Sequence, residues 1–165
     1  MMRSLNRLLS DRSGASAAEM ALATPLLIIL MFGAFELGYY FLSEHVVQKS
    51  VRDAARYAGR LPLSSYPACS PTAAAQTQIQ KVARTGRPDG TVQRLQGWTA
   101  DTMTTVTVIC DTSGTYAGVF VDNPLGAPTI TVAANVPYIS LFGALGIGQP
   151  SLMLRARSQS AGFGA

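Results

Sequence analysis

Few side chains in this sequence carry the chemistry of catalysis or metal binding. Its 165 residues include one histidine, His45, and two cysteines, Cys69 and Cys110, whose separation fits no CxxC metal or redox motif. The region after residue 42 contains no G-x-S-x-G nucleophile motif and no pair of carboxylates at catalytic spacing. We therefore expect no catalytic residue, no metal site and no cofactor.

Two carboxylates stand instead against an apolar segment, where a charge is costly. Glu19 directly precedes that segment and Glu36 lies inside it. Ser16 and Glu19 have the spacing of a capping box, with Ser16 as the N-cap and Glu19 as the third residue of a helix. The helix macrodipole favours a carboxylate at that end in any case. A capping role and a recognition role for Glu19 are compatible hypotheses.

The apolar segment has the length and composition of a membrane-spanning helix. Residues 20–42 hold 18 apolar or aromatic residues out of 23. Such a helix rises about 34 Å, enough to cross the roughly 30 Å hydrocarbon core of a bilayer. The positive-inside rule keeps the N-terminus cytoplasmic and places residues 43–165 across the membrane, because the segment follows three arginines (Arg3, Arg7 and Arg12). A cleaved secretory signal is disfavoured, since no small-x-small site follows the apolar run.

We expect one helix to run from about Ala15 to Ala58. Beyond the apolar segment, small and apolar residues continue one stripe at helical spacing (Val47, Val51, Ala54, Ala55 and Ala58). Gly59 then supplies a C-terminal stop, and Pro62 prevents the helix from resuming. Pro25 removes a backbone donor inside the helix, so a kink or local melting is expected there.

The junction SGASAAEM, residues 13–20, has a family pattern. Gly14 is followed by Ala-Ser-Ala-Ala and Glu19, between a basic tail and an apolar helix. This arrangement resembles the class III signal peptides of type IV pilin-like proteins. The longer stretch GASAAEMALATPLLIILMFGAFELGYYF, with VQKSVRDAARYAGR after it, resembles the TadE-like family of minor pseudopilins. The resemblance covers residues 12–60.

The resemblance implies that a prepilin peptidase cuts between Gly14 and Ala15. It divides the chain into a cytoplasmic leader (1–14), a long helix (15–60) and an α+β domain (61–165) that is periplasmic, or extracellular after assembly into a pilus. It also implies that Glu19 of one subunit pairs with the new N-terminal amine of a neighbour. Pilins usually begin with a large N-methylated residue, and Ala15 departs from that pattern.

Two further features keep alternatives open. Glu36 lies about 9 Å of helical rise from Leu42, so it either makes an intersubunit contact within the membrane or reaches the periplasmic headgroups. Cys69 and Cys110 are expected to form a disulfide in an exported domain, where closing a loop of about forty residues is worth about 4 kcal/mol. Two free buried thiols are the alternative.

Residues 61–165 are predicted to form a small pilin-like α+β domain. Residues 61–71 are expected to be a loop, and Ser70 and Pro71 to start a helix that ends near Arg84. Residues 102–110, 129–136 and 151–159 alternate in hydrophobicity as strands do. We expect these strands to form an antiparallel sheet packed on the amphipathic half of the long helix.

The low charge of the chain narrows its functions. Charged residues make up 13% of the sequence, about half of the usual share, and the formal net charge is +4. The arginines are scattered, so we expect no nucleic-acid partner. The leading hypothesis is a minor pseudopilin of a tight-adherence (Flp-type) pilus in a bacterial inner membrane. Its partners would be a prepilin peptidase, other pilins, inner-membrane platform proteins and the lipid bilayer. A membrane-anchored periplasmic binding or structural protein outside any filament is the alternative, and an anchored enzyme is disfavoured.

Overall fold

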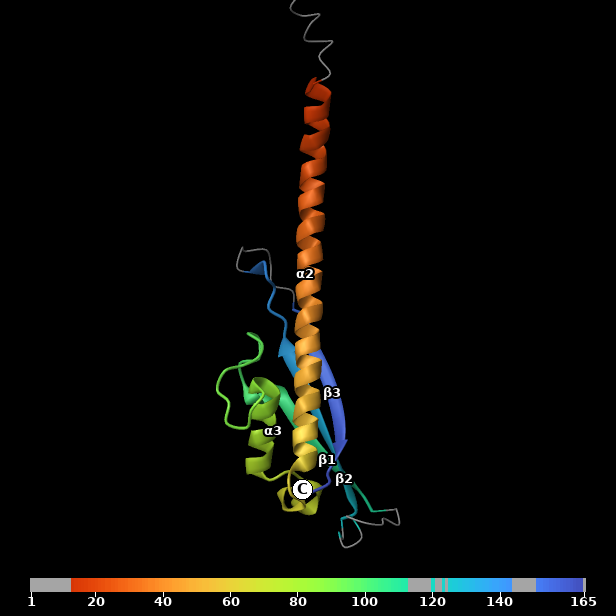
Figure 1. The fold of residues 1–165 in the computed structure, drawn as a ribbon, viewed down its shortest axis with the longest axis vertical. Helices are drawn as coiled ribbons and strands as arrows, with labels where there is room; N and C mark the ends of the chain where they lie inside the picture. Colours follow the sequence, from red (N-terminus) through yellow and green to blue (C-terminus); the bar gives the residue numbers. More distant parts are fainter. Residues whose placement is uncertain (1–12, 113–119, 121–122, 124, 144–150, 165) are drawn as a thin grey trace, which may run out of the picture. The chain divides into compact units, whose positions relative to one another are not determined.

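The computed structural model describes residues 13–112, 120, 123, 125–143 and 151–164. The chain divides into two compact units, Met1–Tyr39 and Tyr40–Ala165, and the boundary falls within one helix. The second unit contains the rest of that helix, a second α-helix and a three-stranded antiparallel sheet (Figure 1). The prediction of an α+β fold with a long N-terminal helix packed on a small antiparallel sheet is confirmed.

Helix α2, Ser13–Arg60, is the longest element and has 48 residues. It begins before the predicted start at Ala15 and ends beyond the predicted end at Ala58. Ser16 therefore lies inside the helix, and the prediction that it is the N-cap of a capping box is wrong. The alanine-rich residues around it favour helix strongly, and nothing in their sequence stops the helix from extending back to Ser13.

α2 continues through Pro25 without a break, so of the two effects expected at this residue, a kink or local melting, the local melting does not occur. Proline removes one backbone donor, but the preceding Thr24 stays in the helix and its hydroxyl donates to the carbonyl of Met20 at 2.6 Å. One missing hydrogen bond is not enough to interrupt a helix with leucine- and isoleucine-rich flanks.

Gly59 has a different role from the predicted helix stop. It lies within α2 at the point where the helix crosses strand β3 (Met153–Ala161). A Cβ atom added to Gly59 would lie 2.5 Å from the Ser160 Oγ and 2.6 Å from the Ala161 carbonyl oxygen. The carbonyl of Gly59 also accepts a hydrogen bond from the Phe163 amide at 2.8 Å. Glycine is required here by the close approach of two backbones.

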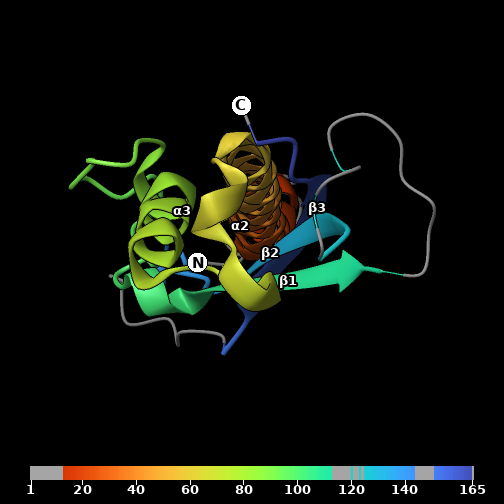
Figure 2. The same cartoon turned by 90° about the horizontal axis from the view of Figure 1, so that it is seen from below.

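The sheet contains β1 (Thr104–Asp111), β2 (Ala127–Pro137) and β3, in that order, with antiparallel pairing throughout. Each strand was predicted, with shifts at its ends; the residues before β1 form a 3₁₀ turn, Asp101–Met103. α2 and α3 lie on the same face of the sheet (Figure 2). The alternation predicted for β2 is confirmed, since the four residues facing the helices are at most 4% exposed (Ile130, Val132, Ala134 and Val136).

Helix α3, Ala73–Thr85, starts later than predicted. Its N-cap is Thr72, whose side chain accepts a hydrogen bond from the Ala75 amide at 3.3 Å, so Ser70 is not the cap. The helix cannot begin at Ser70 because a short 3₁₀ turn, η2 (Pro67–Cys69), ends there and the next residues are extended. Gly86 closes α3 in the left-handed conformation with φ 87°.

The segment predicted as a loop, residues 61–71, holds two 3₁₀ turns, η1 (Leu63–Ser65) and η2. Tyr66 lies between them with 3% of its surface exposed, and its hydroxyl donates to the Ala58 carbonyl at 2.6 Å. Burial, reinforced by the nearby Tyr57, raises the pKa of Tyr66 to about 12. Tyr66 therefore anchors the segment to the end of α2.

Candidate processing and assembly site

The predicted cleavage junction lies in the first turn of α2. Gly14 and Ala15 are both helical and exposed. A Cβ atom on Gly14 would meet no atom of the chain within 4 Å, and Gly14 has no positive φ. Glycine in a helix costs about 0.5–1 kcal/mol relative to alanine, and nothing in the described fold calls for that cost at this residue.

Glu19 is exposed on the next turn of the same helix. Within the described residues its carboxylate makes no hydrogen bond and no ion pair. Ala15 and Glu19 are at positions i and i+4, which lie on one helix face about 6 Å apart along the axis. The carboxylate thus lies on the face where cleavage after Gly14 would create an amine.

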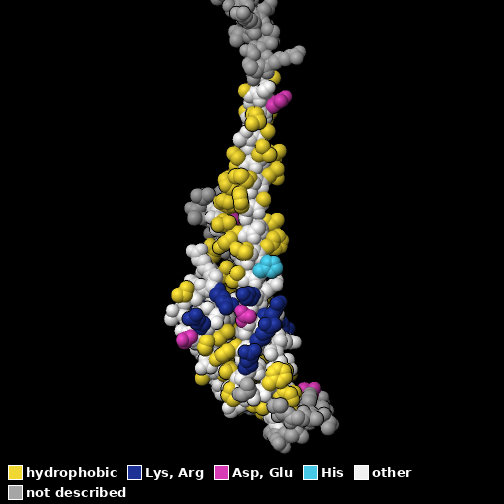
Figure 3. Space-filling view, in the orientation of Figure 1, with side chains coloured by type: hydrophobic (Ala, Val, Ile, Leu, Met, Phe, Trp, Pro, Cys, Tyr) yellow, Lys and Arg dark blue, Asp and Glu magenta, His cyan; other side chains and the backbone are white. Residues whose placement is uncertain are grey.

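The part of α2 that follows Glu19 exposes apolar side chains on all sides. Exposure reaches 81% for Leu22, 68% for Ile29 and 60% for Phe35. Figure 3 shows hydrophobic side chains along this part of the helix. The helix is long and apolar enough to cross a membrane, and none of its most apolar window is buried. An apolar surface of this extent marks contact with lipid or with another protein.

Glu36 lies half-buried within the apolar part of α2. It follows Glu19 by 17 residues, which is about 26 Å of helical rise. The two carboxylates predicted as site residues are therefore not brought together in one chain. Each has to be explained by its own surroundings.

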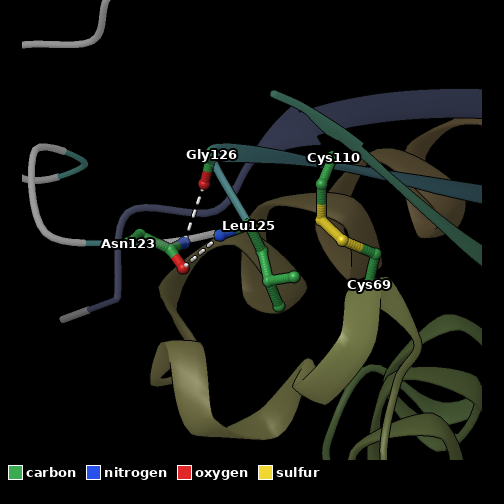
Figure 4. Close-up of a disulfide and its surroundings, with 5 residues drawn as sticks. All are labelled: Cys69, Cys110, Asn123, Leu125 and Gly126. Atoms are coloured by element: carbon green, nitrogen blue, oxygen red, sulfur yellow. Dashed lines mark hydrogen bonds between the residues drawn. A yellow bond between two sulfur atoms is a disulfide. The ribbon is translucent and has the colours of Figure 1, made fainter. Parts of the chain in front are cut away.

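The remaining predicted site residues, Cys69 and Cys110, are joined by a disulfide, with their Cα atoms 5.8 Å apart (Figure 4). The bond links η2 to the end of β1. Ala68 and Cys69 have φ values of 51° and 58°, a left-handed conformation that costs non-glycine residues about 1–2 kcal/mol each. The cross-link fixes the path of the chain between α2 and α3 despite that cost.

The turn that leads into β2 lies close to the disulfide (Figure 4). The Asn123 side chain donates to the Gly126 carbonyl at 2.7 Å and accepts from the Leu125 amide at 3.2 Å. Gly126 has a φ of 72°, and a Cβ on it would collide with the Asp111 carbonyl oxygen. These contacts begin the pairing of β2 with the end of β1.

Sequence reasoning missed the contacts that hold residues 86–103 against α2. The Arg94 guanidinium donates to the Ser50 hydroxyl at 3.1 Å and to the Asp53 carboxylate at 3.2 Å. Trp98, the only tryptophan of the chain, is fully buried. Its large apolar ring in an otherwise polar stretch was the available signal for a core residue.

The fold and the exposed helix define a class: an α+β protein whose N-terminal helix is compatible with a single-pass membrane anchor. Within that class, residues 14–56 match the family model described as TadE-like protein. The resemblance predicted from residues 12–60 is thereby confirmed over the matched segment, and it connects the chain with Tad pilus assembly and with other pilus components. No curated protein and no solved structure matches the chain.

Proposed function

We propose that this chain is a minor pseudopilin of a Tad (tight-adherence) pilus. In this proposal it is a structural subunit without catalytic activity. It is made as a precursor, cut after Gly14 by a prepilin peptidase on the cytoplasmic side, and used to initiate, cap or anchor the filament. The observation that carries the proposal is the combination of Gly14 and Glu19 in the first turns of α2, directly before its exposed apolar part.

Gly14 supports the processing step. Because its surroundings are open and its conformation is helical, the described fold does not call for glycine at this position, and recognition by a peptidase would account for it. A peptidase acts on locally opened backbone, and glycine makes the first turn of α2 easier to open by about 1 kcal/mol. The exposed position of this turn at the end of the helix leaves it accessible.

Glu19 supports the assembly step. The α-amine created on Ala15 is cationic at neutral pH, and an unpaired charge costs several kcal/mol in an apolar setting. In the cleaved chain, Glu19 is the acidic group nearest to that amine in sequence, and it lacks a partner among the described residues. Its pairing with the amine of a neighbouring subunit neutralises both charges and favours a fixed helix-to-helix register.

The proposed setting is a bacterial inner membrane crossed once by residues 20–42, with residues 43–165 in the periplasm. Other pilins, the peptidase and inner-membrane platform proteins are the proposed partners. Glu36 lies within the span, and we propose that it contacts another subunit there. The second candidate is a bitopic membrane-anchored protein that never enters a filament, because such a protein would have the same exposed apolar helix as a pseudopilin.

The N-terminus of the mature protein separates the two candidates. In host cells that carry the pilus machinery, mass spectrometry of the purified protein should find Ala15 as the first residue. Gly14→Leu should keep Met1 or the leader, because leucine fits the helix but not a glycine-specific peptidase. Gly33→Leu is the matched control, since Gly33 also has open surroundings in the same helix. An intact leader on the wild-type chain would leave only the anchored protein.

A further inference from the structure

Cationic residues line one groove in the second unit. The groove lies between α2 and β3, has a volume of about 290 Å³ and is lined by Gln48, Arg52 and residues 155–158. A second hollow of about 400 Å³ runs along α2, shares Gln48 and Arg52 with the first, and also contains Lys49 and Arg56. Figure 3 shows Lys and Arg side chains gathered over this part of the molecule. We call the two hollows together the basic groove.

The cations of the basic groove have no acidic partner within the described residues (Lys49, Arg52, Arg56, Arg155 and Arg157). The carboxylate among its lining residues belongs to Asp53, and Arg94 binds that carboxylate at 3.2 Å. Positive charge therefore remains uncompensated on both sides of the β3 edge: on α2, which covers one face of the sheet, and on Arg155 and Arg157, whose side chains lie toward the other face.

One wall of the basic groove is the edge of the sheet. Among the strands of the described residues, β3 pairs only with β2. The Tyr138 amide donates to the Leu152 carbonyl and the Gly162 amide to the Pro128 carbonyl, both at 2.9 Å. Because backbone groups alternate along an antiparallel strand, the even-numbered residues of β3 turn their amide and carbonyl groups toward β2. Arg155 and Arg157 therefore turn theirs outward, to the open edge.

The opposite edge of the sheet is contacted at both ends of β1. By the same alternation, the even-numbered residues of β1 point their backbone groups away from β2. The Thr104 carbonyl accepts a hydrogen bond from the Gln80 side chain at 2.8 Å, and Cys110 is tied to Cys69. On β3, α2 lies against the backbone at the end of the strand, where Gly59 meets Ser160 and Ala161. In the described structure, no comparable contact covers the edge at Arg155 and Arg157.

We propose that the β3 edge at Arg155 and Arg157 is a docking site for an extended acidic segment of a partner protein. The segment would add a fourth strand beside β3 and hydrogen-bond to the outward amides and carbonyls of these two residues. Its side chains would alternate between the two faces of the new strand. One set would meet the cations of α2, and the other would lie beside the Arg155 and Arg157 side chains.

Charge complementarity identifies an acidic partner and excludes a second copy of this chain. The nearest acidic residues in this sequence are eight positions apart, so the chain has no acidic segment of its own to offer. Beyond residue 42, Lys and Arg also outnumber Asp and Glu by ten to six. Two copies would bring like charges together.

The basic groove lies too far from the membrane for lipid headgroups to fill it. With residues 20–42 in the hydrocarbon, Arg52 and Arg56 lie about 15 and 21 Å of helical rise beyond Leu42. The headgroup layer extends only about 5–8 Å on each side of a bilayer. This step rests on the proposed membrane anchorage, whereas the docking site itself does not depend on incorporation into a pilus.

The test uses the full chain in nanodiscs of zwitterionic phosphatidylcholine. The probe is a ten-residue peptide of alternating threonine and glutamate, and the control is a peptide of alternating proline and glutamate with the same charge. Hydrogen exchange is read residue by residue. The probe should slow exchange at the Arg155 and Arg157 amides much more than at Ala156 and Ser158, whose amides already bond to β2. The proline peptide should leave all four unchanged.

Two variants of Arg157 distinguish the contribution of its backbone amide to binding from the contribution of its side-chain charge. Arg157→Pro removes an outward amide without breaking the ladder to β2 and should abolish binding. Arg157→Gln removes the same charge but keeps the amide, and it should weaken binding roughly threefold. Arg87→Gln, at an exposed arginine outside the groove, should have no effect.

Three results would overturn the proposal. The first is equal binding of the proline and threonine peptides, and the second is equal binding by Arg157→Pro and Arg157→Gln. The third is binding to vesicles of anionic phosphatidylglycerol through Arg155 and Arg157 with no binding of the peptide, which would assign the groove to lipid.

Discussion

Replacing Gly59 by alanine tests whether the crossing of α2 and β3 holds the second unit together. The new methyl group would lie 2.5 Å from the Ser160 hydroxyl oxygen and 2.6 Å from the Ala161 carbonyl oxygen. The serine side chain can rotate away, but the carbonyl belongs to the backbone of β3 and can move only with the strand. The helix and β3 must therefore separate by several tenths of an ångström.

The expected change in the free energy of unfolding follows from two opposing effects. Overpacking of this kind costs about 2–3 kcal/mol. Alanine is a better helix former than glycine by about 1 kcal/mol. We expect Gly59→Ala to lower the free energy of unfolding by a net 1–2 kcal/mol. For a unit of this size that corresponds to a fall of roughly 3–10 °C in the melting temperature.

Trp98 supplies the assay. It is the only tryptophan and is fully buried in the second unit, so its fluorescence follows the unfolding of that unit alone. Gly38→Ala is the matched control, because a Cβ at Gly38 meets nothing within 4 Å. Adding Ser160→Ala to Gly59→Ala should restore only part of the stability, since the Ala161 carbonyl remains. A Gly59→Ala variant as stable as the wild type would refute the close approach of the two backbones.

Three further predictions concern stability, pH and assembly. Replacing Cys69 and Cys110 together by alanine should lower the free energy of unfolding by about 2–3 kcal/mol. Loss of the cross-link costs about 4 kcal/mol through loop closure, and relaxation of the left-handed backbone at Ala68 returns about 1–2 kcal/mol of it. Urea titration followed by fluorescence measures this, and reduction of the wild type should reproduce it. The folded-state pKa of Tyr66, about 12, lies above the usual tyrosine value of 10.0, so the stability that the neutral phenol contributes is complete below pH 10 and is lost as the pH rises through 12. Tyr66→Phe should remove that alkaline loss and cost about 0.5–1.5 kcal/mol at neutral pH, both seen in melts at several pH values. Glu19→Gln should leave membrane insertion intact but reduce pilus number more than tenfold, because the buried amine keeps its charge unpaired. Pilus counts by electron microscopy measure this, and normal piliation would contradict it.

Local sequence signals predicted the elements better than their ends. The alternation of β2 and the stripe along the second half of α2 were readable because burial on one face leaves a periodic pattern. Ser16 and Ser70 were both assigned as caps because their side chains suit a helix start. In each case a neighbour decided otherwise: alanines extended α2 past Ser16, and the turn at Cys69 moved the start of α3 to Thr72.

Contacts between residues that are far apart in the sequence leave no local sequence pattern from which they could be predicted. Gly59 has the sequence signature of a helix stop, and only the position of β3, about a hundred residues later, shows why glycine is there. The Arg94 contacts to Ser50 and Asp53 also join segments more than forty residues apart. The open edge of β3 depends on strand order and on which backbone groups face outward. Neither can be deduced from a single strand.

The disulfide between Cys69 and Cys110 also sets an order of events. In a chain exported as proposed, the bond cannot close until residue 110 has left the reducing side of the membrane, because thiols stay reduced in the cytoplasm. By then α3 and most of β1 have emerged, while β2 and β3 follow. The central strand, β2, therefore pairs with β1 after the disulfide has fixed the position of β1. A chain whose export stops before residue 110 has crossed the membrane has no disulfide and remains competent for export.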